Sequence, residues 1–157
     1  MAVVQYKRSK YFAITELVCP HVYSRHKEQA WAFIDGKLID IIDFLKEKYP
    51  NRKIIINNYN VKQGGHTQRG LRCNLCQLVK DKTKAITVYL SQHIFGAAID
   101  FTVEGLTADQ VRADIILWRD ELPHPIRMES KALAPTYVHL DTGIYAQQTG
   151  QKITIIG

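Results

Sequence analysis

The chain has 157 residues, the length of one domain with a core large enough to fold without disulfides. Hydrophobic residues make up 46% of it and charged residues 23%, which excludes a disordered chain, and no apolar run approaches the roughly 20 residues of a membrane span. The formal charge of +6 fits solvated lysine-rich faces or attraction to a polyanion. The basic residues are scattered rather than interleaved with aromatic ones, so we do not predict nucleic-acid binding.

The first half of the chain predicts helices and one strand. Residues 1–12 lack an apolar segment followed by a small-residue cleavage site, so we expect no signal peptide and a cytoplasmic location when the protein is synthesised. Apolar residues at helical spacing predict one or two helices over 27–49, broken near Gly36. The β-branched run 53–57 predicts a buried strand, and the polar stretch 58–84 predicts a long loop.

The second half predicts strands around one helix. Residues 97–103 read as a strand, and 107–122 as a helix that begins at a threonine cap. Two more strands are expected over 125–129 and 136–142, followed by a final hairpin that turns at 149–150. Helices and short strands mix without βαβ alternation, so the sequence predicts one α+β domain over 1–157, with a central antiparallel sheet and flanking helices.

A histidine and a carboxylate lie seven residues apart, at His93 and Asp100. One straight strand would hold them more than about 20 Å apart, so they can meet only if the chain reverses between them. Gly96 permits such a bend, and Asp100 would then point away from the core side chains on either side of it.

A second histidine, His139, shares one face of a predicted strand with Asp141. Two imidazoles and one carboxylate, with a fourth position left to water, form the open tetrahedral site of a catalytic zinc. A peptidase also needs a general base, and Glu129, at the end of the preceding strand, is the best-placed carboxylate. Asp141 is the alternative base, although its position beyond the ligand favours a role in holding an imidazole.

These segments resemble a known family. Residues 91–100 match the S-x-H-x-x-G-x-A-x-D signature of the zinc D-alanyl-D-alanine carboxypeptidases, and 138–141 are similar to that family's second histidine motif. Residues 14–20 and 54–72 resemble its N-terminal segment and the substrate-side loop of its small phage-borne members. The family shares its fold with the hedgehog signalling domain, so the resemblance implies a fold like that of hedgehog and the D,D-peptidases.

The resemblance also implies roles for individual residues. The zinc ligands would be His93, Asp100 and His139, with Glu129 as the catalytic base, although it lies further from His139 in sequence than in the hedgehog arrangement.

On the substrate side, Ser91 would supply a hydrogen bond, and Asn60 occupies the position where many family members carry an arginine. Arg69 and Arg72 are the candidates to replace that arginine, and we favour Arg69 slightly.

The three cysteines argue against a disulfide framework, because their number is odd and no export signal is predicted. Cys73 and Cys76 form a C-x-x-C, which with Cys19 and His21 offers ligands for a second, structural zinc. A lone C-x-x-C is a weak signal, so we expect buried, reduced cysteines instead. His66 would face either the cleft of the predicted zinc site or solvent, and we favour solvent.

Together these features predict a monomeric zinc metallopeptidase that cuts peptidoglycan stem peptides, as a D,D-carboxypeptidase or an endopeptidase. The expected absence of a signal peptide fits a phage lysin, a protein that acts on the cell wall after release or from a virion. The alternative is a catalytically inactive zinc-containing module, hedgehog-like or part of a virion. A nucleic-acid-binding protein is the third reading, and only charge favours it.

Overall fold

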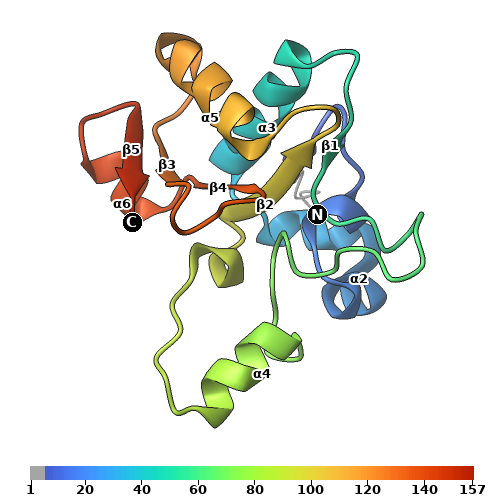
Figure 1. The fold of residues 1–157 in the computed structure, drawn as a ribbon. Coiled ribbons are helices and arrows are strands. Elements are labelled where there is room, and N and C mark those ends of the chain that lie inside the picture. The colour runs from blue at the N-terminus through green and yellow to red at the C-terminus, as the bar shows by residue number, and fades with distance from the viewer. Residues whose placement is uncertain (1–5) are drawn as a thin grey trace, which may run out of the picture.

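A computed structural model describes residues 6–157, and its centre is a five-stranded sheet with helices around it (Figure 1). The strand order is β1-β2-β4-β3-β5. The strands are β1 (Ile54–Ile55), β2 (Ala98–Val103), β3 (Ile126–Glu129), β4 (Val138–Asp141) and β5 (Ile153–Ile156). The coarse class predicted from the sequence, α+β, is confirmed.

The sheet is mixed, which corrects the prediction of an antiparallel sheet. The pairs β1–β2, β2–β4 and β3–β4 are antiparallel, whereas β5 runs parallel to β3. The predicted final hairpin is wrong, because helix α6 (Ile144–Gln148) precedes β5. Since β4 ends beside the start of β3, the short α6 and the turn at Gly150 (φ 69°) return the chain to that same end, and β5 then runs in the direction of β3.

The N-terminal helices are α1 (Ile14–Leu17), α2 (Pro20–His26), the 3₁₀ segment η1 (Lys27–Phe33) and α3 (Gly36–Lys48). The predicted break near Gly36 is confirmed. The 3₁₀ segment ends at Phe33, and Asp35 then caps α3, where its carboxylate accepts a hydrogen bond from the Lys37 amide (2.9 Å). Buried leucines and isoleucines of α3 join the hydrophobic core that includes the inward face of β2.

Helix α5 (Ala108–Leu117) lies above the sheet beside α3 (Figure 1). Its predicted cap is confirmed, since the Thr107 hydroxyl accepts a hydrogen bond from the Gln110 amide (3.2 Å). The predicted helix ends earlier than expected, and the 3₁₀ turn η3 (Arg119–Glu121) follows it. The core therefore lies between the sheet and these two helices, and buried residues of α1 and η1 such as Leu17 and Trp31 extend it.

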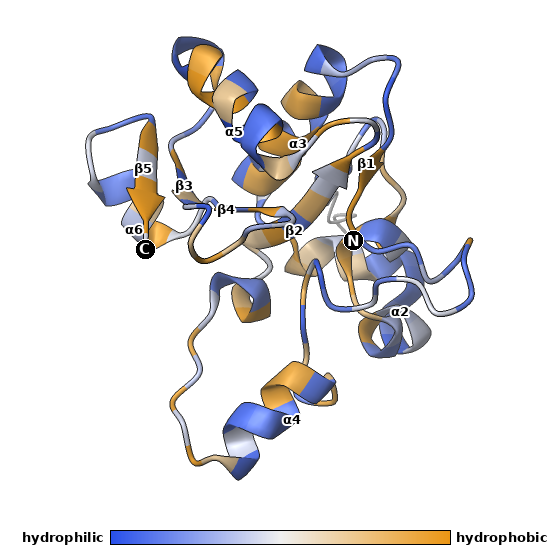
Figure 2. Ribbon diagram, in the orientation of Figure 1, coloured by the Kyte–Doolittle hydropathy of each residue, from blue (hydrophilic) through white to orange (hydrophobic). Residues whose placement is uncertain are grey.

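The long polar stretch contains a helix that the sequence analysis did not predict, α4 (Gln77–Lys84). No residue of α4 is buried, and in Figure 1 the helix stands apart from the sheet, below the rest of the ribbon. Its hydrophobic residues gather in the first turn, and the remainder is mostly hydrophilic (Figure 2). Packing on the core therefore does not hold α4 in place.

Among residues 6–157, no helix is both long enough and apolar enough to cross a bilayer. The expectation about a signal peptide concerns the N-terminus, and its first five residues lie outside the described part of the chain.

Candidate metal centre

The chain reversal predicted between His93 and Asp100 is present. Residues Gln92–Phe95 form the 3₁₀ turn η2, whose cap is the Ser91 hydroxyl, an acceptor for the His93 amide (3.3 Å). Gly96 ends the turn with φ at 67°, and a Cβ atom there would overlap the Phe33 carbonyl oxygen. Only glycine fits this position well, and the chain that leaves it enters β2 with Asp100 on the side of the histidine.

His139 reaches the same point from β4, where it is the cross-strand partner of Asp100. One oxygen of Asp100, Oδ1, lies 3.2 Å from His93 Nε2 and 2.7 Å from His139 Nδ1. The two imidazole nitrogens are 3.3 Å apart, and all three side chains are buried. The structure therefore brings together the three predicted ligands, as a group that could hold a metal ion.

The donor set fits a zinc ion. His93 Nδ1 lies 2.9 Å from the Gly70 carbonyl oxygen, which can only accept, so Nδ1 carries the proton and Nε2 keeps a free lone pair. In a tetrahedral site with metal–ligand bonds of about 2.0–2.1 Å, the ligand atoms are about 3.3–3.4 Å apart. Two of the observed spacings, 3.2 and 3.3 Å, match that value, and the third, 2.7 Å between Asp100 Oδ1 and His139 Nδ1, is shorter, as for a hydrogen bond between them.

Burial and the contacts among His93, Asp100 and His139 shift the pKa of each group. Burial opposes ionisation of Asp100, but the contacts with the imidazoles of His139 and His93 outweigh burial and hold the pKa of Asp100 well below its ordinary value. Burial also lowers the pKa of His93. Burial opposes protonation of His139, but the hydrogen bond to Asp100 and the nearby Asp141 carboxylate outweigh burial and raise the pKa of His139 to about 9. Without a metal, the cluster therefore favours one proton on His139 beside an ionised Asp100.

Charged neighbours hold two of the ligands in place. Asp141 Oδ2 lies 3.8 Å from His139 Nε2, the nitrogen that points away from the cluster, and Asp141 also pairs with Arg127 (2.9 Å). Arg72 Nη2 donates to the second oxygen of Asp100 (2.8 Å), and its Nη1 donates to Tyr89 Oη (2.8 Å). Such contacts fix the orientation of metal ligands.

A cleft of about 370 Å³ opens beside the cluster, and Asp100 is part of its wall. Arg69 also lines the cleft, where its guanidinium lies 6.0 Å from the centre of the Tyr137 ring and makes only long contacts of 3.5 Å to Ile55 O and Thr102 Oγ1. Its charge is therefore available to a bound molecule, whereas that of Arg72 is already paired with a ligand.

Tyr137 is a cleft residue that sequence reasoning missed. It is half-buried, and it directly precedes β4, two residues before His139. The alternation that placed His139 and Asp141 on one face predicts Tyr137 on the same face, so the signal was present. His66, expected in solvent, is exposed but also lines the cleft.

The remaining predicted residues lie around this centre. Glu129 is half-buried, and the pairings of residues 127 with 141 and 128 with 140 place it opposite His139 when the register is extended by one residue. Its carboxylate acts to raise the pKa of His139, which fits this proximity. Ser91 holds the η2 turn, and Asn60 is an exposed turn residue that does not line the cleft.

A second group of metal-binding side chains lies apart from the first. The ligand atoms of Cys19, His21, Cys73 and Cys76 all lie within 4.8 Å of one another. The cysteines are free, and two of the three are buried, as expected. The four side chains named in the sequence as possible ligands of a second zinc nevertheless lie together, although the weak C-x-x-C signal made that the less favoured alternative.

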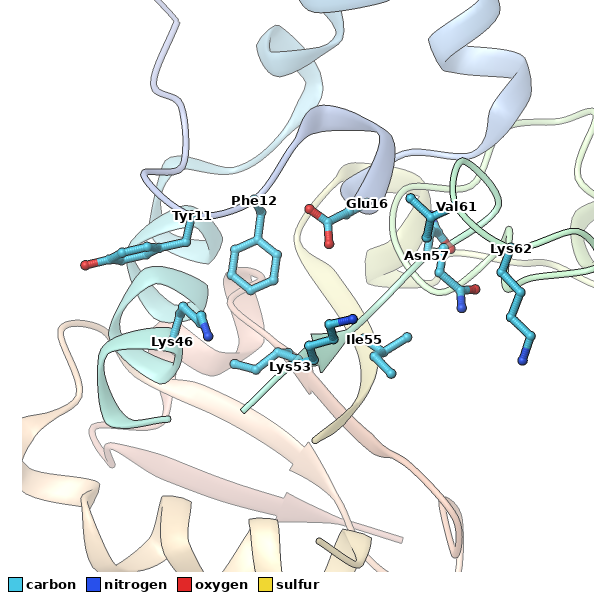
Figure 3. Close-up of a pocket in the computed structure, with 11 residues that line it drawn as sticks. Tyr11, Phe12, Glu16, Lys46, Lys53, Ile55, Asn57, Val61 and Lys62 are labelled. Carbon is cyan, nitrogen blue, oxygen red and sulfur yellow. The ribbon is translucent and has the colours of Figure 1, made fainter. Parts of the chain in front are cut away.

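A larger hollow of about 490 Å³ lies beside β1, between α1, α3 and the loop that follows β1 (Figure 3). Its polar lining includes Glu16 and three lysines, Lys46, Lys53 and Lys62, and it contains neither of the two metal-binding groups. Lys46 already donates to the carbonyl oxygens of residues 49, 50 and 52, beyond the end of α3. We therefore place the chemistry at the smaller cleft.

No family model, curated protein or solved structure matches the chain. The resemblance to the zinc peptidases is carried by the quoted segments alone, and the assignment to that family stays a prediction.

Proposed function

We propose that the protein is a zinc-dependent peptidase that hydrolyses amide bonds in the stem peptides of bacterial peptidoglycan. The observation that carries the proposal is the convergence of His93 Nε2, His139 Nδ1 and Asp100 Oδ1 beside an open cleft. Three protein ligands of this type leave a fourth position for water or substrate, which distinguishes catalytic zinc sites from structural ones.

The chain's own residues supply the other requirements of hydrolysis. When bound, zinc would polarise the substrate carbonyl and lower the pKa of a water molecule to about 7. Glu129, opposite His139, would accept a proton from that water and pass it to the leaving amine. Arg69, beside Tyr137, would bind an anionic group of the substrate or the developing oxyanion.

The substrate class rests on the resemblance of residues 91–100 and 138–141 to the D-alanyl-D-alanine carboxypeptidases. The formal charge of +6 also suits an anionic cell wall. The proposal covers removal of a terminal D-alanine and cleavage within the stem, by a monomer that acts on the wall after release or from a virion, as phage lysins do.

The test is hydrolysis of purified peptidoglycan and of synthetic stem peptides, with the metal content of every sample measured. Glu129→Gln keeps the size of the side chain but removes the base, so we expect a loss of activity of about 10²–10⁴-fold with zinc retained. Glu104→Gln is the matched control, because Glu104 is exposed in the turn after β2 and lies outside the cleft lining.

The outcomes separate the alternatives. Equal activity of wild type and Glu129→Gln would remove Glu129 from its role. No hydrolysis by the zinc-loaded wild type, with both stem-peptide and whole-wall substrates, would refute the peptidase and favour an inactive zinc-containing module. If His93→Ala with His139→Ala does not lower the zinc content, the metal centre itself is wrong.

A further inference from the structure

Among residues 6–157, a second group of side chains could hold a metal ion outside the proposed catalytic centre: Cys19, His21, Cys73 and Cys76. We propose that they bind a second zinc ion, which is structural and fastens the segment before α4 to the N-terminal helices. The site shares no ligand with the first centre, so its presence does not depend on the proposed peptidase activity.

The spacing of the ligand atoms supports tetrahedral binding. Cys19 Sγ and Cys73 Sγ are 3.6 Å apart, and Cys76 Sγ lies 3.8 Å from His21 Nδ1. Zinc–sulfur bonds of about 2.3 Å would set sulfur atoms about 3.8 Å apart in a tetrahedron. A disulfide would need a distance of about 2.05 Å, so these sulfurs are not bonded to each other.

The chemistry of the cluster favours a soft cation. Three cysteines and one histidine form a complete four-ligand set, with no position left for water, which is typical of structural zinc. Cys19 and Cys76 are fully buried, and the Leu75 amide lies 3.4 Å from Cys73 Sγ.

The cluster lies where the segment after α1 meets the segment before α4. Val18 and Leu71 form an isolated parallel bridge, in which the Leu71 amide donates to Leu17 O (2.8 Å) and the Cys19 amide donates to Leu71 O (3.0 Å). The ligands follow this bridge on both sides. Since α4 buries no residue of its own, a metal at Cys76, the residue that caps α4, replaces the hydrophobic packing that the helix lacks.

The second zinc would also support the first centre. Arg72 lies between the bridged Leu71 and the ligand Cys73, and its guanidinium holds the outer oxygen of Asp100. Loss of the second zinc would therefore loosen the contact between Arg72 and Asp100, although the two ions share no donor atom.

The first measurement is zinc per chain, by elemental analysis of protein purified with excess zinc and then desalted. We expect two ions in the wild type, one in Cys76→Ser, and one in the double variant His93→Ala with His139→Ala. His26→Ala is the matched control and should keep two ions, because His26 contacts the Phe33 ring and is not part of either cluster. His21→Cys keeps four ligands and should also retain two.

The second measurement uses cobalt in place of zinc in the wild type and in the double histidine variant, so that it does not depend on whether Cys76→Ser folds. Both proteins should show a thiolate-to-cobalt charge-transfer band, and a chelator should remove it and expose three reactive thiols together. One zinc per wild-type chain, lost in the double histidine variant, would overturn the proposal. Absence of the thiolate band, or a disulfide found by mass spectrometry of the fresh protein, would overturn it as well. None of these readouts needs hydrolytic activity, so a failure of the second-zinc proposal can be distinguished from a failure of the peptidase proposal.

Discussion

Asp141→Asn tests whether the carboxylate behind His139 tunes the metal centre. Asp141 is 1% exposed, and it receives hydrogen bonds from Arg127 Nε at 3.2 and 3.1 Å and from the Gly143 amide at 3.1 Å. The amide of asparagine has almost the same shape but no charge. It therefore cannot stabilise the imidazole of His139 as a ligand or balance the charge of Arg127.

The expected losses follow from those contacts. Removal of such a supporting carboxylate typically weakens metal affinity by about 10–100-fold, or about 1.4–2.7 kcal/mol. Breaking a buried charge pair costs roughly 3–5 kcal/mol of folding stability, and we expect the lower end because the Arg127 side chain is 22% exposed and can be solvated.

Binding of zinc to the apoprotein is measured in buffers of fixed free zinc, with Cys76→Ser titrated in parallel to assign the two binding steps. Unfolding by urea gives the stability. The matched control is Asp114→Asn, which replaces the charged acceptor of the Tyr49 hydroxyl (2.7 Å) with a neutral amide, away from the centre. It should cost about 1 kcal/mol of stability and leave zinc binding unchanged. If Asp141→Asn folds and binds zinc with wild-type affinity, Asp141 is only a structural partner of Arg127, and the reasoning about His139 is refuted.

Three further predictions concern the bend, the cleft and the surface. Gly96→Ala should cost about 1–3 kcal/mol of stability in thermal melts and lower zinc occupancy, because φ at 67° is strained for alanine and its Cβ would meet backbone; unchanged melting would contradict this. Arg69→Met should lower kcat/KM by about tenfold or more with zinc content unchanged, since its guanidinium faces the cleft; a fall in zinc content instead would make it a support of the ligands. Asp40→Asn should cost less than about 1 kcal/mol near neutral pH. Burial opposes ionisation of Asp40, but hydrogen bonds from Lys7 and His124 outweigh burial and place its pKa below 3.8. The carboxylate therefore contributes stability above that pH and loses the contribution as the pH falls, so urea unfolding of variant and wild type should converge in acid.

Local patterns predicted most of the elements. The helical spacing over 27–49, the threonine cap at 107 and the bend at Gly96 depend on neighbours a few residues apart, and all three are present. The same locality explains why His93 and Asp100 could be paired from the sequence, since one glycine determines whether they meet. His139 followed from alternation on its strand, and the same alternation could have identified Tyr137.

The tertiary structure decided what depends on distant contacts. Cys19 and Cys73 are 54 residues apart, so their approach depends on the bridge between Val18 and Leu71 rather than on any motif. Arg69 was only slightly favoured over Arg72 from the sequence, whereas in the structure Arg72 donates to Asp100 and Arg69 lines the cleft without that contact. The direction of β5 likewise depended on α6 and the turn at Gly150, which return the chain to the end of the sheet where β3 begins. A sequence pattern specifies which side chains share a face, but the partner of that face is selected only when the whole chain packs.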